Sequence, residues 1–285
     1  MISLKRVGEA ILVLIIATGV LPVHAGPAPR PIFLKLNQYY ILYTHPTPPF
    51  IDKGGRVMVP DVVPKLMGLE VTVDPGSHAA AHIARGGRSI LIFVSQPWAN
   101  VDDPTEPRRV DVVPRARLVG TPGEMFIPLR ILTDTFGFSA TWNPKSRIVS
   151  LSDKRIMSPT PPPRTFAFFE EELIKTRTVD TDKLIPAAFT LERVKEHGVD
   201  RLQMTLLLRT ISGRDIPYGQ QALYTFVERM SGILELGGRD IFISPDMGRT
   251  KDPCVKTRTG FRCRERFSIT RDPIRYIAVR VRMRK

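Results

Sequence analysis

Cysteine, histidine and tryptophan are scarce in this 285-residue chain, which contains two, five and two of them. Two thiols alone supply too few ligands for a zinc site, which is usually four-coordinate. Several enzyme motifs are also missing: the Gly-x-Ser-x-Gly elbow, the nucleotide phosphate loop, the dinucleotide fingerprint and His-Glu-x-x-His. Because carboxylates can hydrolyse glycosides without a readable motif, these absences favour a non-catalytic protein without excluding an enzyme.

Long apolar runs are missing after the first 25 residues. Within them, Lys5 and Arg6 precede an apolar run over 11–20, and Ala25 ends the stretch with a small residue. This order is typical of a secretory signal peptide. The alternative is a retained membrane anchor, but the run is shorter than the ~20 residues that a spanning helix needs. We therefore predict cleavage after Ala25 and a secreted or extracytoplasmic protein.

What the chain does contain is a strand–helix–strand pattern that occurs twice. In the copy over 123–143, an apolar run before Pro128 predicts a strand, and the spacing over 129–136 predicts a short helix. Gly137 suits the left-handed conformation that commonly ends a helix. The alternation that follows predicts a half-buried strand, with Trp142 buried between sheet and helix. A turn over 143–146 and a return strand over 147–151 come next.

The earlier copy covers 55–74 and has the same order, with Pro60 and Gly68 at the corresponding places. It is one residue shorter between proline and glycine. Pro64 lies inside its helix, so we expect that helix to be short or distorted. An internal repeat of this kind defines the structural unit of the fold.

The two copies resemble the signature of the copper amine oxidase N-terminal domain-like, or stalk domain, family. That signature is similar to Gly-Arg-Thr-Met-Val-Pro-Leu-Arg, a short helix, Leu-Gly and then Val-x-Trp-Asp. The matching residues are Gly55, Arg56, Met58, Val59, Pro60, Gly68 and Asp74, and then Met125, Ile127, Pro128, Leu129, Arg130, Gly137 and Trp142. Glu124 stands where the signature has arginine. The resemblance covers about 32–152 and implies an α+β module of antiparallel sheet packed on short helices.

Because this resemblance covers only the accessory domain, it implies no catalytic residue, no cofactor and no copper. His78 and His82 are the one candidate pair of metal ligands, since two histidines four residues apart would share a face if the segment were a helix. The resemblance instead places them in a strand-and-hairpin region before Gly86. Exposed histidines near a turn are the favoured interpretation.

A proline-rich stretch over 158–163 divides the chain, because such runs act as semi-rigid spacers. We predict a stalk-type domain over 32–155, a linker over 156–165 and an all-β sandwich domain over 166–285. The sandwich, of immunoglobulin-like or related type, is indicated by short alternating segments such as Leu202, Met204, Leu206 and Leu208.

The two cysteines, Cys254 and Cys263, flank a predicted hairpin turn. If the hairpin arms pair symmetrically, the two residues lie opposite each other. An exported chain with two cysteines favours a disulfide over a metal site.

Positive charge is concentrated at the C-terminus, where 251–285 contains twelve Lys or Arg and three Asp or Glu, a net charge of +9. Alternation predicts that Arg280, Arg282 and Arg284 line one face of the last strand. Such a face attracts an anionic cell-wall polymer or membrane surface. Nucleic acid is disfavoured by export, extracellular DNA excepted, and a merely solvated basic face is the alternative.

The sequence therefore predicts an exported, non-catalytic protein that binds or scaffolds at the cell envelope. Two alternatives stay open. One is a secreted envelope hydrolase with an unrecognised carboxylate site, and the other is an inhibitor or accessory subunit of a secreted enzyme. The second would have a secreted protein as its partner.

Overall fold

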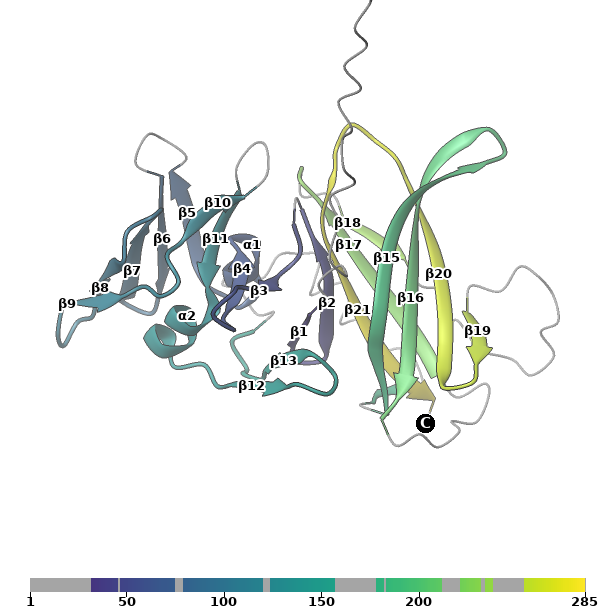
Figure 1. Ribbon diagram of the computed structural model, residues 1–285, viewed down its shortest axis with the longest axis horizontal. Coiled ribbons are helices and arrows are strands. Elements are labelled where there is room, and N and C mark those ends of the chain that lie inside the picture. Colours follow the sequence, from purple (N-terminus) through teal and green to yellow (C-terminus); the bar gives the residue numbers. More distant parts are fainter. Residues whose placement is uncertain are drawn as a thin grey trace, which may run out of the picture. The chain divides into compact units, whose positions relative to one another are not determined.

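The computed structural model describes residues 32–45, 47–74, 79–119, 124–156, 178–181, 183–211, 221–231, 234–237 and 254–284. The predicted signal peptide, His78 and nearly all of the predicted linker lie outside these ranges. The described fold is rich in β-strands and has two short helices, which agrees with the β-rich, α+β character that the sequence predicts (Figure 1). In the part of the chain that is described, neither helix is long and apolar enough to cross a membrane.

The largest sheet has eight strands and joins segments from opposite ends of the chain. Its order is β12-β13-β1-β2-β21-β17-β18, and β14 also pairs with β21. The bounds of these strands are β1 (Phe33–Leu36), β2 (Tyr39–Thr44), β12 (Ala140–Asn143), β13 (Ile148–Leu151), β14 (Thr178–Asp180), β17 (Gln221–Arg229), β18 (Leu234–Gly237) and β21 (Ile274–Arg284). Only β1 and β13 pair in parallel. Strands from both sides of the predicted linker therefore share one sheet, with β2 beside β21 (Figure 1). The predicted domain boundaries stay a prediction.

A four-stranded antiparallel sheet in the order β15-β16-β20-β19 lies in the C-terminal part. Its strands are β15 (Leu184–Glu196), β16 (Val199–Thr210), β19 (Cys254–Thr257) and β20 (Gly260–Ser268). Buried residues of this sheet, among them Met204 and Leu206, share one hydrophobic cluster with Val279 and Val281 of β21. We call this cluster the sandwich core. A β-sandwich is therefore present, while its immunoglobulin-like type stays a prediction.

Two smaller sheets and both helices come from the predicted stalk module. One sheet has the order β10-β11-β4-β3, from β3 (Phe50–Ile51), β4 (Val57–Pro60), β10 (Arg117–Val119) and β11 (Glu124–Pro128). The other runs β5-β6-β7-β8-β9, from β5 (Glu70–Asp74), β6 (Ala80–Arg85), β7 (Arg88–Phe93), β8 (Trp98–Asp102) and β9 (Arg108–Asp111). The helices are α1 (Val62–Leu66) and α2 (Leu129–Phe136).

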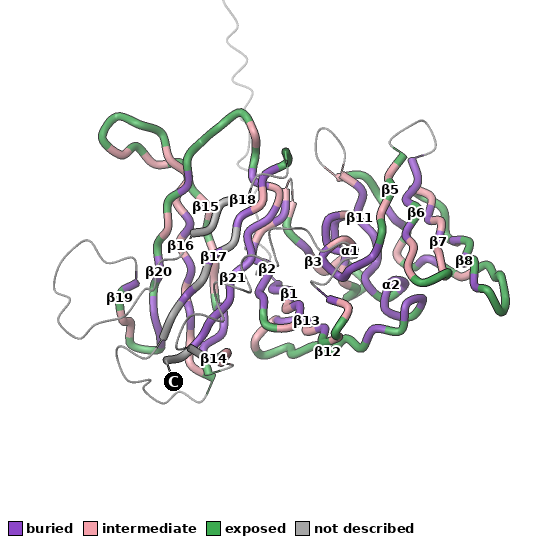
Figure 2. The backbone as a smooth tube through the Cα atoms, turned by 180° about the vertical axis from the view of Figure 1, so that it is seen from behind, coloured by how far each residue is buried: buried purple, intermediate pink, exposed green. Residues whose placement is uncertain are grey.

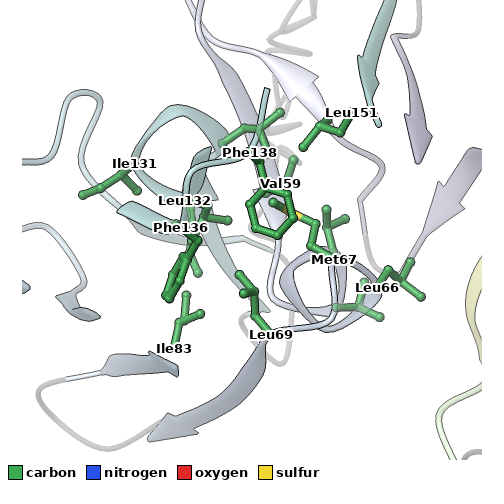
Figure 3. Packing of buried hydrophobic residues seen from close by; sticks show 14 of the residues in the cluster. Val59, Leu66, Met67, Leu69, Ile83, Ile131, Leu132, Phe136, Phe138 and Leu151 are labelled. Carbon is green, nitrogen blue, oxygen red and sulfur yellow. The ribbon is translucent and has the colours of Figure 1, made fainter. Parts of the chain in front are cut away.

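These elements enclose a second cluster, which we call the helix-side core. Figure 3 shows Val59 and Met67 beside Leu132 and Phe138, so residues of the two sequence copies pack together. The predicted strand, helix, second strand and return strand of the second copy are confirmed as β11, α2, β12 and β13. The prediction that the second strand is half-buried is wrong, because all four residues of β12 are exposed. Gly137 follows α2 with a φ of 67°, as the sequence predicts.

The two copies meet through corresponding positions. Strands β4 and β11 pair antiparallel, and Val59 lies opposite Ile127. These two residues hold the same place in the two copies, immediately before Pro60 and Pro128. The helix of the first copy contains Pro64 and has only five residues, as the sequence predicts. The internal repeat itself stays a prediction.

The central strands of the eight-stranded sheet are covered on both faces, because their alternate residues enter different cores. Tyr39 of β2 and Tyr276 of β21 belong to the helix-side core. Their neighbours Tyr40 and Ile277 belong to the sandwich core. Successive side chains of a strand point to opposite faces, so both faces of β2 and β21 are buried.

Candidate functional site

The two cysteines form the predicted disulfide. Cys254 of β19 lies directly opposite Cys263 of β20, and their sulfur atoms are bonded. Both residues are buried against the sandwich core. The bond therefore ties the short strand β19 to its neighbour, and we assign it a structural role.

The predicted exposure of Arg280 and Arg282 is wrong, because each is only 8% exposed. Arg280 donates two hydrogen bonds of 2.6 Å to the Asp180 carboxylate and one of 2.8 Å to the Tyr39 hydroxyl. The physical reason is that β21 is an inner strand with both faces covered, rather than a strand with one solvated face. The side chain of Arg284 lies outside the described set. Binding of an anionic ligand by these arginines stays untested.

Trp142 is also not where the sequence predicts it. Its residue surface is 42% exposed, whereas Phe138 is 6% exposed and belongs to the core. All four residues of β12 are exposed, and β12 ends the eight-stranded sheet as an edge strand (Figure 2). Phe138, just before the strand, is buried in the helix-side core, and Trp142 is not.

The exposed indole lines a pocket of about 630 Å³. We call it the Trp142 groove and define it by Trp142, Phe138 and Val57 together with Arg56 and Arg130. It is formed by both sequence copies, because Arg56 and Val57 come from the first copy and the other three from the second. Three of these residues, Arg56, Arg130 and Trp142, are residues that match the family signature.

The groove combines exposed apolar surface with an exposed, weakly paired arginine. Val113 lines it and is 55% exposed. Arg130 Nε lies 3.3 Å from Asp134 Oδ2, and the two side chains are 88% and 66% exposed. An exposed pair of this kind contributes only about 0–1 kcal/mol, so the guanidinium can turn to a ligand at little cost. A second recess of about 420 Å³ shares Val113, Arg130 and Asp134 and extends the groove toward Arg108.

A partly buried carboxyl group, that of Glu124, lies outside this groove. Burial raises the pKa of Glu124 to about 8, and the neighbouring Asp61 carboxylate adds to the increase. Burial and the charge of Glu124 also raise the pKa of the Tyr43 hydroxyl. Neither Glu124 nor Asp61 lines the Trp142 groove. Glu124 and Asp61 are two interacting carboxyl groups, as the hydrolase alternative requires.

Among the described residues, no three His, Cys, Asp or Glu side chains gather in a way that would hold a metal ion. His82 is exposed on β6, in the strand-and-hairpin region that the resemblance indicates. His78 lies outside the described ranges, so the predicted pair is not compared further.

Comparison with known families places the groove in a recognised domain. Residues 35–151 match the family model of the copper amine oxidase N-terminal domain. A copper amine oxidase N-terminal-like domain is present. It contains both sequence copies and every residue that defines the Trp142 groove. The match includes no catalytic amine oxidase domain. No curated protein and no solved structure matches the chain.

One feature of the sequence indicates the groove, although the alternating pattern led to a prediction that Trp142 is buried. Arg56, Arg130 and Trp142 match the family signature, yet arginine is rarely a core residue. Two arginines in one signature with a tryptophan indicate a surface site more than a core. The pairing of β4 with β11, which brings the two copies together, could not be read from the sequence.

Proposed function

We propose that this is an exported, non-catalytic protein that binds a component of the cell envelope through the Trp142 groove. The observation that carries the proposal is an exposed tryptophan in a concave site whose rim holds two arginines. Concave sites with apolar walls and a few convergent polar groups are the usual form of ligand sites. Scaffolding at the envelope is the wider role that such binding would serve.

The chemistry of the groove favours a glycan strand of the cell wall. The flat face of Trp142 offers a large apolar surface with a polar N–H at its edge. Arg56 and Arg130 carry forked donors that bind carboxylate and hydroxyl oxygens. Wall glycans present both kinds of surface, because a sugar ring has an apolar face of C–H groups and a polar rim.

Two features support export. The order of charges and apolar residues over 1–25 is that of a cleaved signal peptide. The disulfide between Cys254 and Cys263 suits an oxidising compartment outside the cytoplasm. N-terminal sequencing of the exported protein should begin at Gly26, and a retained Met1 would contradict cleavage.

The hydrolase alternative receives less support from the geometry. Glycoside hydrolysis generally uses two carboxyl groups that flank the scissile bond. The carboxylate lining the groove, Asp134, is paired with Arg130. Glu124 and Asp61 lie elsewhere. An accessory role toward a secreted enzyme would instead need a surface that binds a protein.

The test is sedimentation of purified 26–285 with insoluble wall glycan. Trp142→Ala should lower the affinity at least about tenfold, since a buried aromatic contact of this size is worth more than about 1.4 kcal/mol. Leu118→Ala is the matched control, because Leu118 is 43% exposed and lies outside the groove. Equal binding by native protein and Trp142→Ala would reject the groove as the site. Release of soluble fragments from the glycan would instead support the hydrolase.

A further inference from the structure

The exposed face of the four-stranded sheet carries a row of arginines. In β20, Phe261, Cys263 and Phe267 are buried in the sandwich core. Arg262, Arg264 and Arg266 alternate with this buried face and are all exposed. Alternation thus produces on β20 the exposed line of basic residues that the sequence predicts for β21. The difference is that, among the described residues, no second core covers the outer face of this sheet.

The neighbouring strand extends this basic face. Residues that pair in adjacent antiparallel strands lie on the same face, and Leu207, Thr205 and Gln203 of β16 lie opposite Arg262, Arg264 and Arg266. The same alternation along β16 adds Arg201 at one end, whereas Arg209 at the other end donates a hydrogen bond to the Lys145 carbonyl and is not part of this face. Two glutamates of β15, Glu192 and Glu196, belong to this face by the same register.

The acidic residues neutralise only one end of the row. Glu196 Oε1 accepts a hydrogen bond from Arg266 Nη1, and Glu196 Oε2 lies 4.0 Å from Arg201 Nε. Arg266 Nε also donates to the Gln203 side chain. Within the described ranges, neither Arg262 nor Arg264 has a carboxylate partner. Their guanidinium groups are therefore available to an external anion.

The row is held on a rigid support. Cys263 lies between Arg262 and Arg264 and points to the opposite face, where it forms the disulfide with Cys254. Strand β20 is thus fixed on one side by β16 and on the other by a covalent link to β19. A site that is rigid before binding loses less entropy when the ligand arrives.

We infer that this face binds a linear anionic wall polymer whose repeating units carry phosphate groups. Alternate residues on a strand are roughly 7 Å apart, so the three arginines offer evenly spaced donors along a straight line. Arginine binds phosphate through two parallel N–H bonds, which favours phosphate over a diffuse charge. The choice of a wall polymer rests on the export proposed above, whereas binding of phosphate does not.

Other polyanions fit the face less well. Surfaces that bind single-stranded nucleic acid combine basic residues with aromatic side chains on which bases stack. The described residues of this face include no aromatic side chain. A membrane surface would need apolar side chains that insert between lipids. Val255, which lies opposite Arg262 on β19, is 58% exposed, but Leu207, opposite Arg262 on β16, is only partly exposed.

The test measures the affinity of 26–285 for purified poly(glycerol phosphate) over a range of salt concentrations. The variant is Arg262→Gln with Arg264→Gln, and the matched control is Arg193→Gln with Lys195→Gln. The control removes the same charge from exposed residues of β15 that alternate to the other face. Retained secondary structure and an intact disulfide would show that each variant folds.

We expect the Arg262/Arg264 variant to weaken binding at least about tenfold at low salt. The slope of log affinity against log salt should become less negative by roughly 1.4. The reason is that about 0.7 counterions are released per neutralised phosphate on a single strand, and the variant lacks two arginines. The control should change the affinity less than about twofold. Equal losses in both variants, or no binding by the native protein, would overturn the inference. So would tighter binding to oligothymidine or to phosphatidylglycerol vesicles.

The two proposed sites are distinguishable in the same assays. Trp142→Ala should leave binding to poly(glycerol phosphate) unchanged. The Arg262/Arg264 variant should leave sedimentation with phosphate-free wall glycan unchanged. Failure of one site therefore does not imply failure of the other.

Discussion

Arg280 and Asp180 are 100 residues apart in the sequence and are joined by two hydrogen bonds of 2.6 Å. The pair ties β14 to β21, and Tyr39 of β2 accepts a third hydrogen bond from the same guanidinium. Three strands that are distant in the sequence thus meet at one buried cation. A residue that the sequence assigns to a binding surface is part of the internal structure.

Replacement of Arg280 should therefore destabilise the protein. Removal of one partner from a buried ion pair typically costs about 3–5 kcal/mol, because the other charge stays buried. Asp180 is 28% exposed at its side chain, so we expect Arg280→Gln to cost about 2–4 kcal/mol in denaturant unfolding. Arg264→Gln, on an exposed face, is the control and should cost less than about 0.5 kcal/mol. Equal stability of native protein and Arg280→Gln would contradict the described pairing.

Trp142→Ala should leave stability nearly unchanged. A buried aromatic residue costs about 3–5 kcal/mol on truncation to alanine, but Trp142 is 42% exposed on an edge strand. We expect a loss below about 1 kcal/mol in denaturant melts. Phe138→Ala, at 6% exposure in the helix-side core, should cost about 3–5 kcal/mol. The reverse order of the two losses would mean that Trp142, and not Phe138, fills the core.

The two signature glycines should respond differently to alanine. Gly68 and Gly137 have φ angles of 77° and 67°, so alanine is strained by about 1–2 kcal/mol at either position. A Cβ at Gly68 would also collide with the backbone oxygen of Arg155, whereas one at Gly137 would meet nothing within 4 Å. Gly68→Ala should therefore lose at least about 1 kcal/mol more than Gly137→Ala in thermal or denaturant unfolding. Equal losses would contradict the close approach of Arg155.

Glu124 should make the protein less stable as pH rises. Its pKa is raised from 4.5 to about 8 in the folded chain. Between these values the unfolded chain has released the proton and the folded chain has kept it, so stability falls with increasing pH over this window. Above about pH 8 the two states carry the same charge at this residue, and the fall stops.

Glu124→Gln should remove this dependence. The variant should gain stability relative to the native protein as the pH is raised from 5 to 8, as measured by denaturant unfolding at each pH. Glu70→Gln, at an exposed position on β5, is the control and should keep the native slope. A native slope in Glu124→Gln would show that another group causes the pH dependence.

Local chemistry determined much of what the sequence predicts correctly. Pro128 and Gly137 set the limits of α2 through their backbone preferences, and the structure has the helix between them. The hairpin spacing placed Cys254 opposite Cys263. Alternation along the last strand placed Ile277, Val279 and Val281 in a core. Each of these depends on residues that are close in the sequence, so it can be read from the sequence alone.

The tertiary structure alone decided which faces are covered. Alternation shows that Arg280 and Arg282 share a face, just as it shows that Arg262 and Arg264 do. It cannot show that β14 and the helix-side core cover the first face while the second stays exposed, because those partners come from distant parts of the chain. The same holds for Trp142, whose exposure follows from the edge position of β12. Burial depends on which strands pair across long sequence separations, and that pairing fixed which residues are available for binding.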